Sequence, residues 1–206
     1  QLKIFELKES KRLPKIIAVT KTHSITDILP LINHGHQDYG ENKIQEALEK
    51  WENIKLDFKH LNLHMIGKLQ SNKVKQAVSL FDYIHSLDNL KLAEKISNEQ
   101  IKQNKKVKLF IQINIGEESQ KNGVSVSEID KFYKTCTDDF GLNIIGLMCL
   151  PPNSEDVVKY FLKMKDLKNK LGLNDLSMGM SNDYLEALKF ETTYLRVGSK
   201  IFGQRN

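Results

Sequence analysis

Apolar residues along this chain switch repeatedly between short β-rich runs and stretches with helical spacing. The first run, KIIAVTK, ends at Lys21, and the stretch after it has Ile25, Ile28, Leu29 and Ile32 on one helical face. Further β-rich runs follow in the order QDYGEN, LNLHMIG, YIHSLD, VKLFIQINI, LNIIGLMCL, DLSMG and YLRVG. The pattern therefore predicts eight strands that alternate with helices.

The stretches between these runs predict helices over residues 24–35, 43–54, 71–81, 89–103, 127–140, 154–172 and 181–190. Ser71 is the expected N-cap of the third of these helices, and Gly172 is the expected C′ residue of the sixth. Pro151 and Pro152 end the sixth strand in a loop. The tail that begins at Ser199 is too short for a full eighth helix.

Near-continuous apolar strands separated by helices are typical of a parallel sheet that is covered by helices. Eight such units predict a single (β/α)8 TIM barrel, an α/β fold, over residues 1–206, a length near the lower end for that fold. The alternative is an open doubly wound sheet. That alternative is disfavoured because no GxGxxG follows the first strand, and no phosphate-binding GxxxxGK[ST] motif is present.

Composition narrows the class of protein. The net charge of +5 and pI of about 9.0 leave nucleic-acid binding open, but the lysines alternate with acids along helical faces, so we expect no nucleic-acid partner. No apolar run reaches the length of a membrane span, and the segment from Gln1 onwards has no apolar signal core. Cys136 and Cys149 are too few for a disulfide framework, which favours a reducing, cytoplasmic setting without membrane association.

Polar residues gather where the predicted strands end, and in barrels of this kind chemistry takes place at the C-terminal strand ends. Lys21 is the sharpest candidate, because a lysine near apolar walls or other cations has a lowered pKa and can form a Schiff base. A solvated lysine that merely ends a strand is the alternative. The other residues at strand ends are Glu41, Asn42, Gly67, Gln70, Ser71, Asn72, Ser86, Asn114, Met148, Ser177, Ser181, Arg196, Gly198 and Ser199.

The end of the chain carries a second signal, for phosphate. Ser181 opens a predicted helix, whose free N–H groups favour an anion, although an ordinary N-cap serine would look the same. Gly198 and Ser199 follow the eighth strand, and barrels often hold phosphate in the loops after strands seven and eight. Arg196 precedes them and could instead form a rim ion pair. A metal site is not expected, because the histidine pairs lack a third ligand; these pairs are His34 with His36 and His60 with His64.

Eight longer segments resemble one family, the YggS/PROSC or pyridoxal phosphate homeostasis proteins. They are AVTKTH, DYGENKIQEA, HMIGKLQSNK, IHSLD, IQINIGEESQKNGV, IIGLMCLPP, LSMGMSNDY and YLRVGSKIFGQR, in the order of that family. The resemblance implies a barrel similar to the N-terminal domain of alanine racemase, with pyridoxal 5′-phosphate held as a Schiff base on Lys21. It also implies that phosphate is held by Ser181, Gly198 and Ser199, that Arg196 faces the pyridine nitrogen, that Asn42 lies near the ring, that Met148 lines the pocket, and that Lys121 assists cofactor handling.

The resemblance implies a protein of intracellular pyridoxal phosphate homeostasis that stores, buffers or delivers the cofactor without evident turnover. An arginine at the ring nitrogen weakens the ring as an electron sink. The alternative is a racemase or lyase acting on a small amino acid, but the chain stops at Asn206, so we expect the second racemase domain to be absent. Recipient apoenzymes are possible partners, and a monomer is expected. Two positions depart from the family: Leu63, where tryptophan is frequent, and Glu191, where a small residue is usual.

Overall fold

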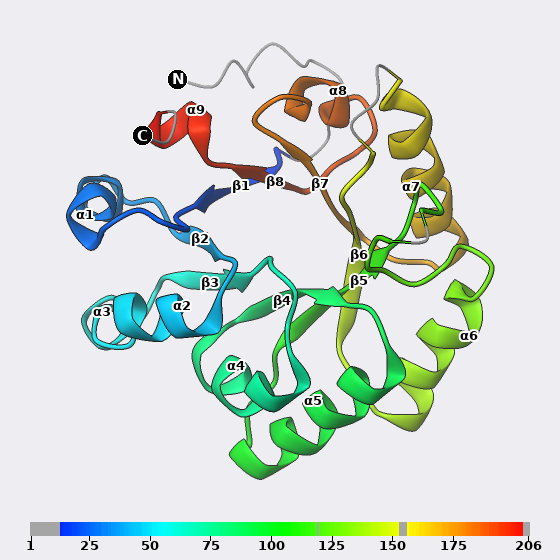
Figure 1. Ribbon diagram of the computed structural model, residues 1–206, viewed down its shortest axis with the longest axis horizontal. Helices are drawn as coiled ribbons and strands as arrows, with labels where there is room; N and C mark the ends of the chain where they lie inside the picture. The colour runs from blue at the N-terminus through cyan, green and yellow to red at the C-terminus, as the bar shows by residue number, and fades with distance from the viewer. Residues whose placement is uncertain (1–12, 119, 153–155, 204–206) are drawn as a thin grey trace.

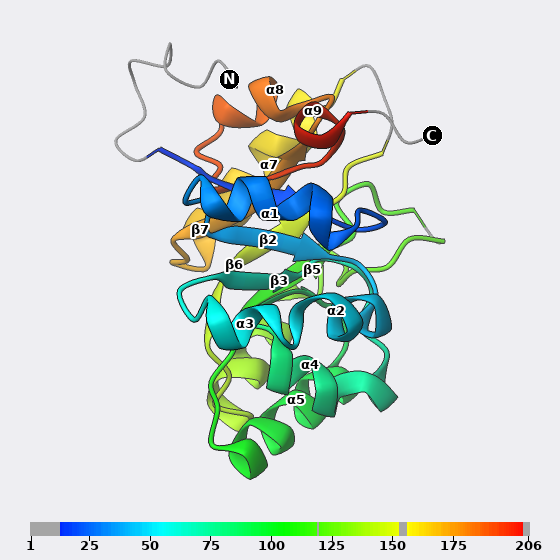
Figure 2. The same ribbon diagram turned by 90° about the vertical axis from the view of Figure 1, so that its left-hand side faces the viewer.

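Eight parallel strands close into a barrel in the order of the sequence, and the last strand pairs with the first. The computed structural model describes residues 13–118, 120–152 and 156–203. Figure 1 shows the strands at the centre and the helices arranged around them, and Figure 2 shows the same arrangement from the side. The expected (β/α)8 barrel is confirmed, and the open doubly wound sheet is excluded by the β1–β8 pairing.

The strands are β1 (Lys15–Val19), β2 (Asp38–Glu41), β3 (Asn62–Met65), β4 (Tyr83–Leu87), β5 (Lys108–Ile113), β6 (Ile144–Cys149), β7 (Asp175–Met180) and β8 (Tyr194–Val197). The helices are α1 (Ile25–Asn33), α2 (Ile44–Trp51), α3 (Ile54–Asp57), α4 (Val74–Leu80), α5 (Leu90–Gln103), α6 (Ile129–Lys134), α7 (Val158–Lys170), α8 (Tyr184–Leu188) and α9 (Ser199–Phe202). Two further segments are a 3-10 helical turn, η1 (Ser71–Lys73), and a π-helical turn, η2 (Thr135–Asp139).

Each predicted strand is present, but several helix boundaries differ from the prediction. The stretch 43–54 is broken after Trp51 and continues into α3, so it is not one helix. Ser71 is the first residue of η1 and not an N-cap, so that assignment was wrong. The sixth predicted helix begins at Val158, and residues 154 and 155 of that prediction lie outside the described residues. Gly172 does follow the helix as C′, with φ of 66°.

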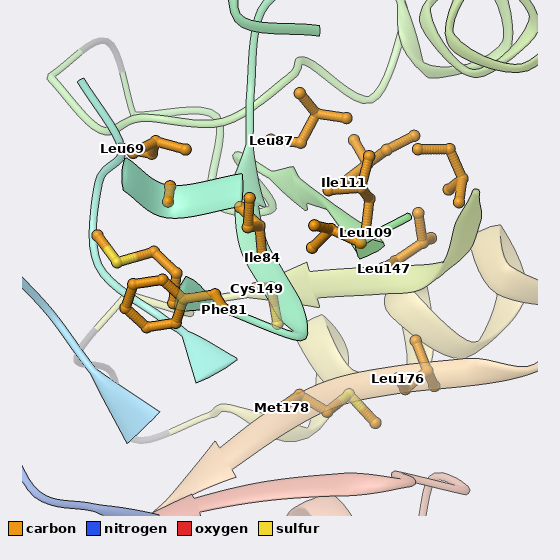
Figure 3. Close-up of a cluster of buried hydrophobic side chains, with 14 of the residues drawn as sticks. Leu69, Phe81, Ile84, Leu87, Leu109, Ile111, Leu147, Cys149, Leu176 and Met178 are labelled. Atoms are coloured by element: carbon orange, nitrogen blue, oxygen red, sulfur yellow. The ribbon is translucent and has the colours of Figure 1, made fainter. Parts of the chain in front are cut away.

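The main hydrophobic core lies between the strands and the helices. Side chains alternate along a strand, so every second residue faces outward. Figure 3 shows outward pairs of this kind on β5, β6 and β7: Leu109 and Ile111, Leu147 and Cys149, and Leu176 and Met178. On β4 the outward residues Ile84 and Leu87 are three apart, because the register with β5 shifts between them. All of these side chains are fully buried. This shell fixes the strands and therefore the positions at which they end.

A smaller cluster fills the inside of the barrel. It consists of Ile17, Tyr83, Phe110, Met148 and Tyr194, each at most 3% exposed. The inward positions are thus partly apolar, as in a packed barrel core. Among the described residues, no helix has the length and apolar character needed to cross a membrane.

Candidate functional site

A pocket of about 860 Å³ lies where the strands end, and its wall combines residues from distant parts of the chain. Its lining includes three cationic side chains, those of Lys21, Lys68 and Arg196, and it includes no carboxylate among the described residues. Six of the seven residues predicted to contact a cofactor line it: Lys21, Asn42, Ser181, Arg196, Gly198 and Ser199. A cavity with this charge pattern favours an anionic ligand.

Strand alternation explains how Lys21 comes to face the pocket. Ile17 is in the inner cluster and Val19 lines the pocket, so Lys21 continues the inward-facing series of β1. Thr20 lies between them on the outward series and is fully buried against α2. The direction of the lysine side chain is therefore a consequence of the strand's period of two residues.

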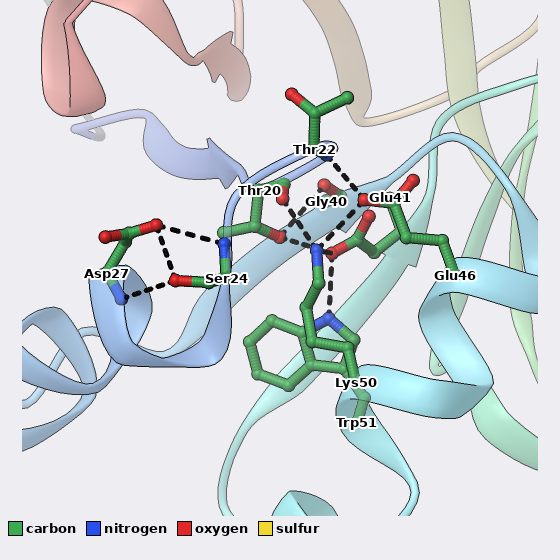
Figure 4. Close-up of polar contacts among 9 residues, drawn as sticks. All are labelled: Thr20, Thr22, Ser24, Asp27, Gly40, Glu41, Glu46, Lys50 and Trp51. Atoms are coloured by element: carbon green, nitrogen blue, oxygen red, sulfur yellow. Dashed lines mark hydrogen bonds and ion pairs between the residues drawn. The ribbon is translucent and has the colours of Figure 1, made fainter.

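A buried polar cluster on the outer side of β1 and β2 holds the backbone around Lys21 (Figure 4). One carboxylate oxygen of Glu41, Oε1, accepts from Thr20 Oγ1 at 2.7 Å, from Lys50 Nζ at 2.9 Å and from Trp51 Nε1 at 2.9 Å. Lys50 Nζ also donates to the carbonyl of Thr20 at 2.8 Å. We call Thr20, Glu41, Glu46, Lys50 and Trp51 the outer clamp. It fixes the residue before Lys21 from outside the barrel.

The same clamp holds the residue after Lys21. Thr22 has a φ of 67°, in the left-handed region that a β-branched residue rarely adopts. Its N–H donates to Glu46 Oε1 at 2.5 Å, and Lys50 donates to the same oxygen at 3.1 Å. Burial opposes ionisation of Glu46, but these contacts outweigh it and keep the pKa of Glu46 below its ordinary value. The charged carboxylate therefore stabilises the turn that follows Lys21.

Glu41 was predicted at the rim because it ends the second strand, and the structure instead points it away from the pocket into the clamp. Asn42, the next residue, lines the pocket. Gly67 lies against Asn42, and a Cβ at Gly67 would come within 2.3 Å of the Asn42 carbonyl oxygen. A glycine at 67 is therefore required for the close approach of these two strand ends.

Arg196 is the most buried residue among those that line the pocket, with 4% of its surface exposed. Nη1 donates to the carbonyl and the hydroxyl of Ser177 at 2.6 and 2.7 Å, and Nη2 donates to the Cys149 carbonyl at 2.8 Å. It forms no ion pair within 4.0 Å in the part of the chain that the structure describes. Burial lowers the pKa of its guanidinium, which nevertheless stays protonated at working pH. A buried cation without a carboxylate partner suits a ligand that accepts hydrogen bonds.

The predicted phosphate residues come together, but not in the way predicted. Ser181 does not open a helix, because residues 181–183 form a turn and α8 begins at Tyr184. Gly198, after β8, donates its N–H to Ser181 Oγ at 3.3 Å. Ser199 follows as the first residue of α9. The loops after β7 and β8 therefore meet at one side of the pocket, which is a frequent phosphate position in these barrels.

Met148, which was predicted to line the pocket, and Lys121, which was predicted to assist cofactor handling, are both absent from its lining. Met148 is fully buried in the inner cluster and does not line the pocket, so its predicted place on the wall needs correction. The reason is depth, since Met148 faces the barrel interior below the pocket, whereas Leu150, two residues further on with the same parity, lines it. Lys121 is exposed and paired with Glu118 at 2.6 Å, while the adjacent Asn122 is the residue that lines the pocket.

Sequence reasoning missed several lining residues: His23, Lys68, Gln112, Leu150, Met180 and Asn122. Gln112 carried a usable signal, because it is the polar position in the otherwise apolar run LFIQI and has the same parity as the inward Phe110. Lys68 donates to Asn122 Oδ1 at 2.6 Å across 54 residues, a contact that no local pattern indicates.

Comparison with known proteins gives a consistent result. The family model for the N-terminal domain of alanine racemase matches residues 5–206. A protein of Aquifex aeolicus named pyridoxal phosphate homeostasis protein is 37% identical over 201 residues, covering 93% of this chain and 87% of the relative. Proteins of the same name from Synechocystis and from Escherichia coli K12 are 36% and 31% identical, each match covering 93% of this chain and 91% and 86% of the relatives.

Comparison with solved structures points to the same family and fold. PipY of Synechococcus elongatus, described with PLP bound, superposes with a TM-score of 0.83 at 30% identity over 92% of each chain. The same protein without PLP gives a TM-score of 0.86 at 31% identity, covering 92% of this chain and 93% of PipY. Alanine racemase of Corynebacterium glutamicum gives 0.72 at 16% identity, covering 93% of this chain and 56% of the racemase, a likeness of fold alone.

Proposed function

The chain belongs to the alanine racemase N-terminal domain family and, within it, to the pyridoxal phosphate homeostasis proteins, and on this basis we propose that it binds pyridoxal 5′-phosphate in the pocket at the strand ends. The proposal rests on one observation: Lys21 and the buried Arg196, which has no carboxylate partner among the described residues, line the same pocket. The cofactor has an aldehyde, a ring nitrogen and a phosphate, and the pocket offers a matching group to each.

Lys21 is the proposed covalent anchor. A primary amine and the aldehyde of pyridoxal phosphate condense to a C=N bond with loss of one water, and this is the chemistry that the cofactor supplies. The outer clamp holds the backbone on both sides of Lys21 through Thr20 and Thr22, so the amine is presented from a fixed strand end. A site carried on a rigid element binds with little loss of side-chain and backbone entropy.

At the other end, Ser181, Gly198 and Ser199 would hold the phosphate, and the cationic pocket wall favours its charge. Arg196 would donate a hydrogen bond to the pyridine nitrogen. Since arginine only donates, that nitrogen is left unprotonated and the ring is a weak electron sink. Asn42 would lie beside the ring. This arrangement supports a protein that stores, buffers or hands on the cofactor and does not turn over an amino acid.

The first test is an absorption spectrum of purified protein with pyridoxal phosphate, followed by borohydride reduction and peptide mass mapping. We expect a Schiff-base band and a reduced adduct on Lys21. Lys21→Ala should lose both and keep weak phosphate binding, whereas Lys121→Ala, an exposed lysine next to the pocket, should keep both. An adduct spread over surface lysines, or one retained in Lys21→Ala, would rule out the proposed anchor.

A second candidate function is racemisation or elimination on a small amino acid, favoured by the family model shared with alanine racemase. Purified protein loaded with cofactor should show no Lys21-dependent turnover of L-alanine or other small amino acids. A clear turnover number that Lys21→Ala abolishes would show that the protein is an enzyme and overturn the carrier proposal.

Delivery of the cofactor is tested by mixing loaded protein with an apoenzyme that requires pyridoxal phosphate and following the recovery of the apoenzyme's activity. The expected monomeric state is tested by sedimentation.

A further inference from the structure

A continuous chain of hydrogen bonds runs through the barrel interior and ends at the pocket. It links Asp38 Oδ1 with His64 Nε2 at 3.0 Å, His64 Nδ1 with His85 Nε2 at 3.0 Å, and His85 Nδ1 with Ser177 Oγ at 2.9 Å. Ser177 Oγ then accepts from Arg196 Nη1 at 2.7 Å. The two histidines and Ser177 are at 0% exposure, and the five residues come from β2, β3, β4, β7 and β8.

The ends of the chain determine where its protons lie. Arg196 can only donate. Burial opposes ionisation of Asp38, but the hydrogen bond from His64 and nearby positive charge, including that of Lys15, outweigh it and keep the pKa of Asp38 below its ordinary value, so this carboxylate accepts. Burial lowers the pKa of His64 more than Asp38 raises it. Burial, together with the positive charge of Arg196, lowers the pKa of His85 further.

Two neutral imidazoles allow one arrangement of these hydrogen bonds. Each neutral ring has one N–H donor and one acceptor nitrogen. His64 must donate from Nε2 to Asp38, which leaves its Nδ1 to accept from Nε2–H of His85. Nδ1 of His85 then accepts the hydroxyl proton of Ser177, so the lone pairs of that hydroxyl face Arg196. Every bond in the chain points from the guanidinium to the distant carboxylate.

We infer that Asp38, His64, His85 and Ser177 are positioning residues that fix the Arg196 guanidinium in the pocket through this directed chain. We call these four residues the inner relay. Asp38 opens β2 at the N-terminal end of the strands, whereas the pocket lies at their C-terminal ends, so the relay spans the barrel. As far as it concerns the cofactor, this inference rests on the proposed function, because Arg196 is there assigned to the pyridine nitrogen.

Ser177→Ala and His85→Phe test the relay at two depths. Ser177→Ala removes the oxygen between Arg196 and His85 while the backbone carbonyl of residue 177 remains. His85→Phe breaks the hydrogen-bond chain at a residue outside the pocket lining. It keeps an aromatic ring beside Phe110, whose ring centroid lies 4.2 Å from that of His85 in the stacked wild-type pair. Tyr194→Phe is the matched control, since it removes a buried hydroxyl from the same interior and lies outside the relay.

Two readouts are measured for each variant. The first is the ¹⁵N–¹H spectrum of the Arg196 guanidinium in protein without cofactor, where we expect separate η signals in the wild type and in Tyr194→Phe, and averaged signals in Ser177→Ala and His85→Phe. The second is the Kd for pyridoxal phosphate and the pKa of its Schiff-base band. We expect a Kd about tenfold higher and a shifted band pKa in the two relay variants, with affinity for inorganic phosphate unchanged.

The outcomes separate the two proposals. If the guanidinium signals of Ser177→Ala and His85→Phe match those of Tyr194→Phe, the relay is only structural and the inference is overturned, whatever the cofactor does. If the signals respond as expected but the wild type binds no pyridoxal phosphate, the positioning of Arg196 stands and the proposed function fails. A changed Kd in Tyr194→Phe equal to that of the relay variants would also count against the relay.

Discussion

Replacing Lys50 by methionine should expose the energetic role of the outer clamp. The Lys50 side chain is 8% exposed and that of Glu41 is 0% exposed, and Nζ of Lys50 donates to Glu41, Glu46 and the Thr20 carbonyl. Among the described residues, Glu41 has no second cation within 4.0 Å. Lys50→Met therefore leaves a buried carboxylate uncompensated, which costs about 3–5 kcal/mol of unfolding free energy.

The partner variant should cost less, because the cluster is asymmetric. In Glu41→Gln, Lys50 still faces Glu46 at 3.1 Å, so we expect a loss of about 1–2 kcal/mol. In Glu41→Gln with Lys50→Met, the amide oxygen can still accept from Thr20 and Trp51 and no charge is stranded. The double variant should therefore be more stable than Lys50→Met alone, a non-additivity expected for residues in contact.

Urea unfolding followed by circular dichroism measures these differences. Lys50→Met should lower the midpoint by about 1–2 M at an m-value of roughly 2–3 kcal/mol/M. Lys170→Met is the control, because the Lys170–Asp130 pair is more than half exposed and such pairs contribute at most about 1 kcal/mol. Equal midpoints for the two lysine variants, or a double variant that loses the sum of the single losses, would refute the reasoning.

Three further predictions concern other parts of the molecule. Burial holds the pKa of His64 and His85 below 6.5, so on acidification protons bind these histidines in the unfolded chain first. The free energy of unfolding should therefore fall by up to about 1.4 kcal/mol per pH unit and per histidine as the pH drops below 6.5. Urea midpoints at pH 7.5 and 5.5 measure this loss. Burial raises the pKa of Cys136 and Cys149 to about 12, so a thiol reagent at pH 8 should label them only in urea. Gly67→Ala should push the strand end that lines the pocket, lowering stability by about 1–3 kcal/mol and raising the Kd for pyridoxal phosphate in an absorption titration.

The fold was accessible from sequence because alternation of β-rich and helical stretches is a local property. Boundaries were less accessible where no glycine or proline marks them. The break between α2 and α3 falls at Glu52 and Asn53, and its neighbour Trp51 is committed by a long-range hydrogen bond to Glu41. The π-helical η2 likewise has no breaker within it. Ser71 resembles an N-cap locally, although Gln70 is the N-cap of η1 and Ser71 is its first residue.

The candidate site was partly accessible for a similar reason. Strand ends are local features, and they identified Lys21, Arg196 and the residues after β7 and β8. Whether a side chain at a strand end faces the pocket depends on its parity, which turns Glu41 outward, and on its depth, since Met148 faces inward but lies below the lining residues. The inner relay was out of reach, because His85 and Ser177 are 92 residues apart and meet only when the barrel closes.

The outer clamp and the inner relay should have separate effects, because their strand residues face opposite sides of the barrel wall. The outer clamp joins outward residues at the ends of β1 and β2 to α2 and acts on the backbone that carries Lys21. Its variants should therefore change stability and the proposed covalent link together. The inner relay uses inward residues and acts on Arg196, so its variants should change the ring end of the pocket and leave the residues after β7 and β8 unaffected. A ligand held covalently at one end and by a fixed cation at the other needs both devices, since either contact alone leaves the opposite end free to rotate. On the proposed function, the two sides of one strand period would thus let a small barrel fix both ends of its ligand.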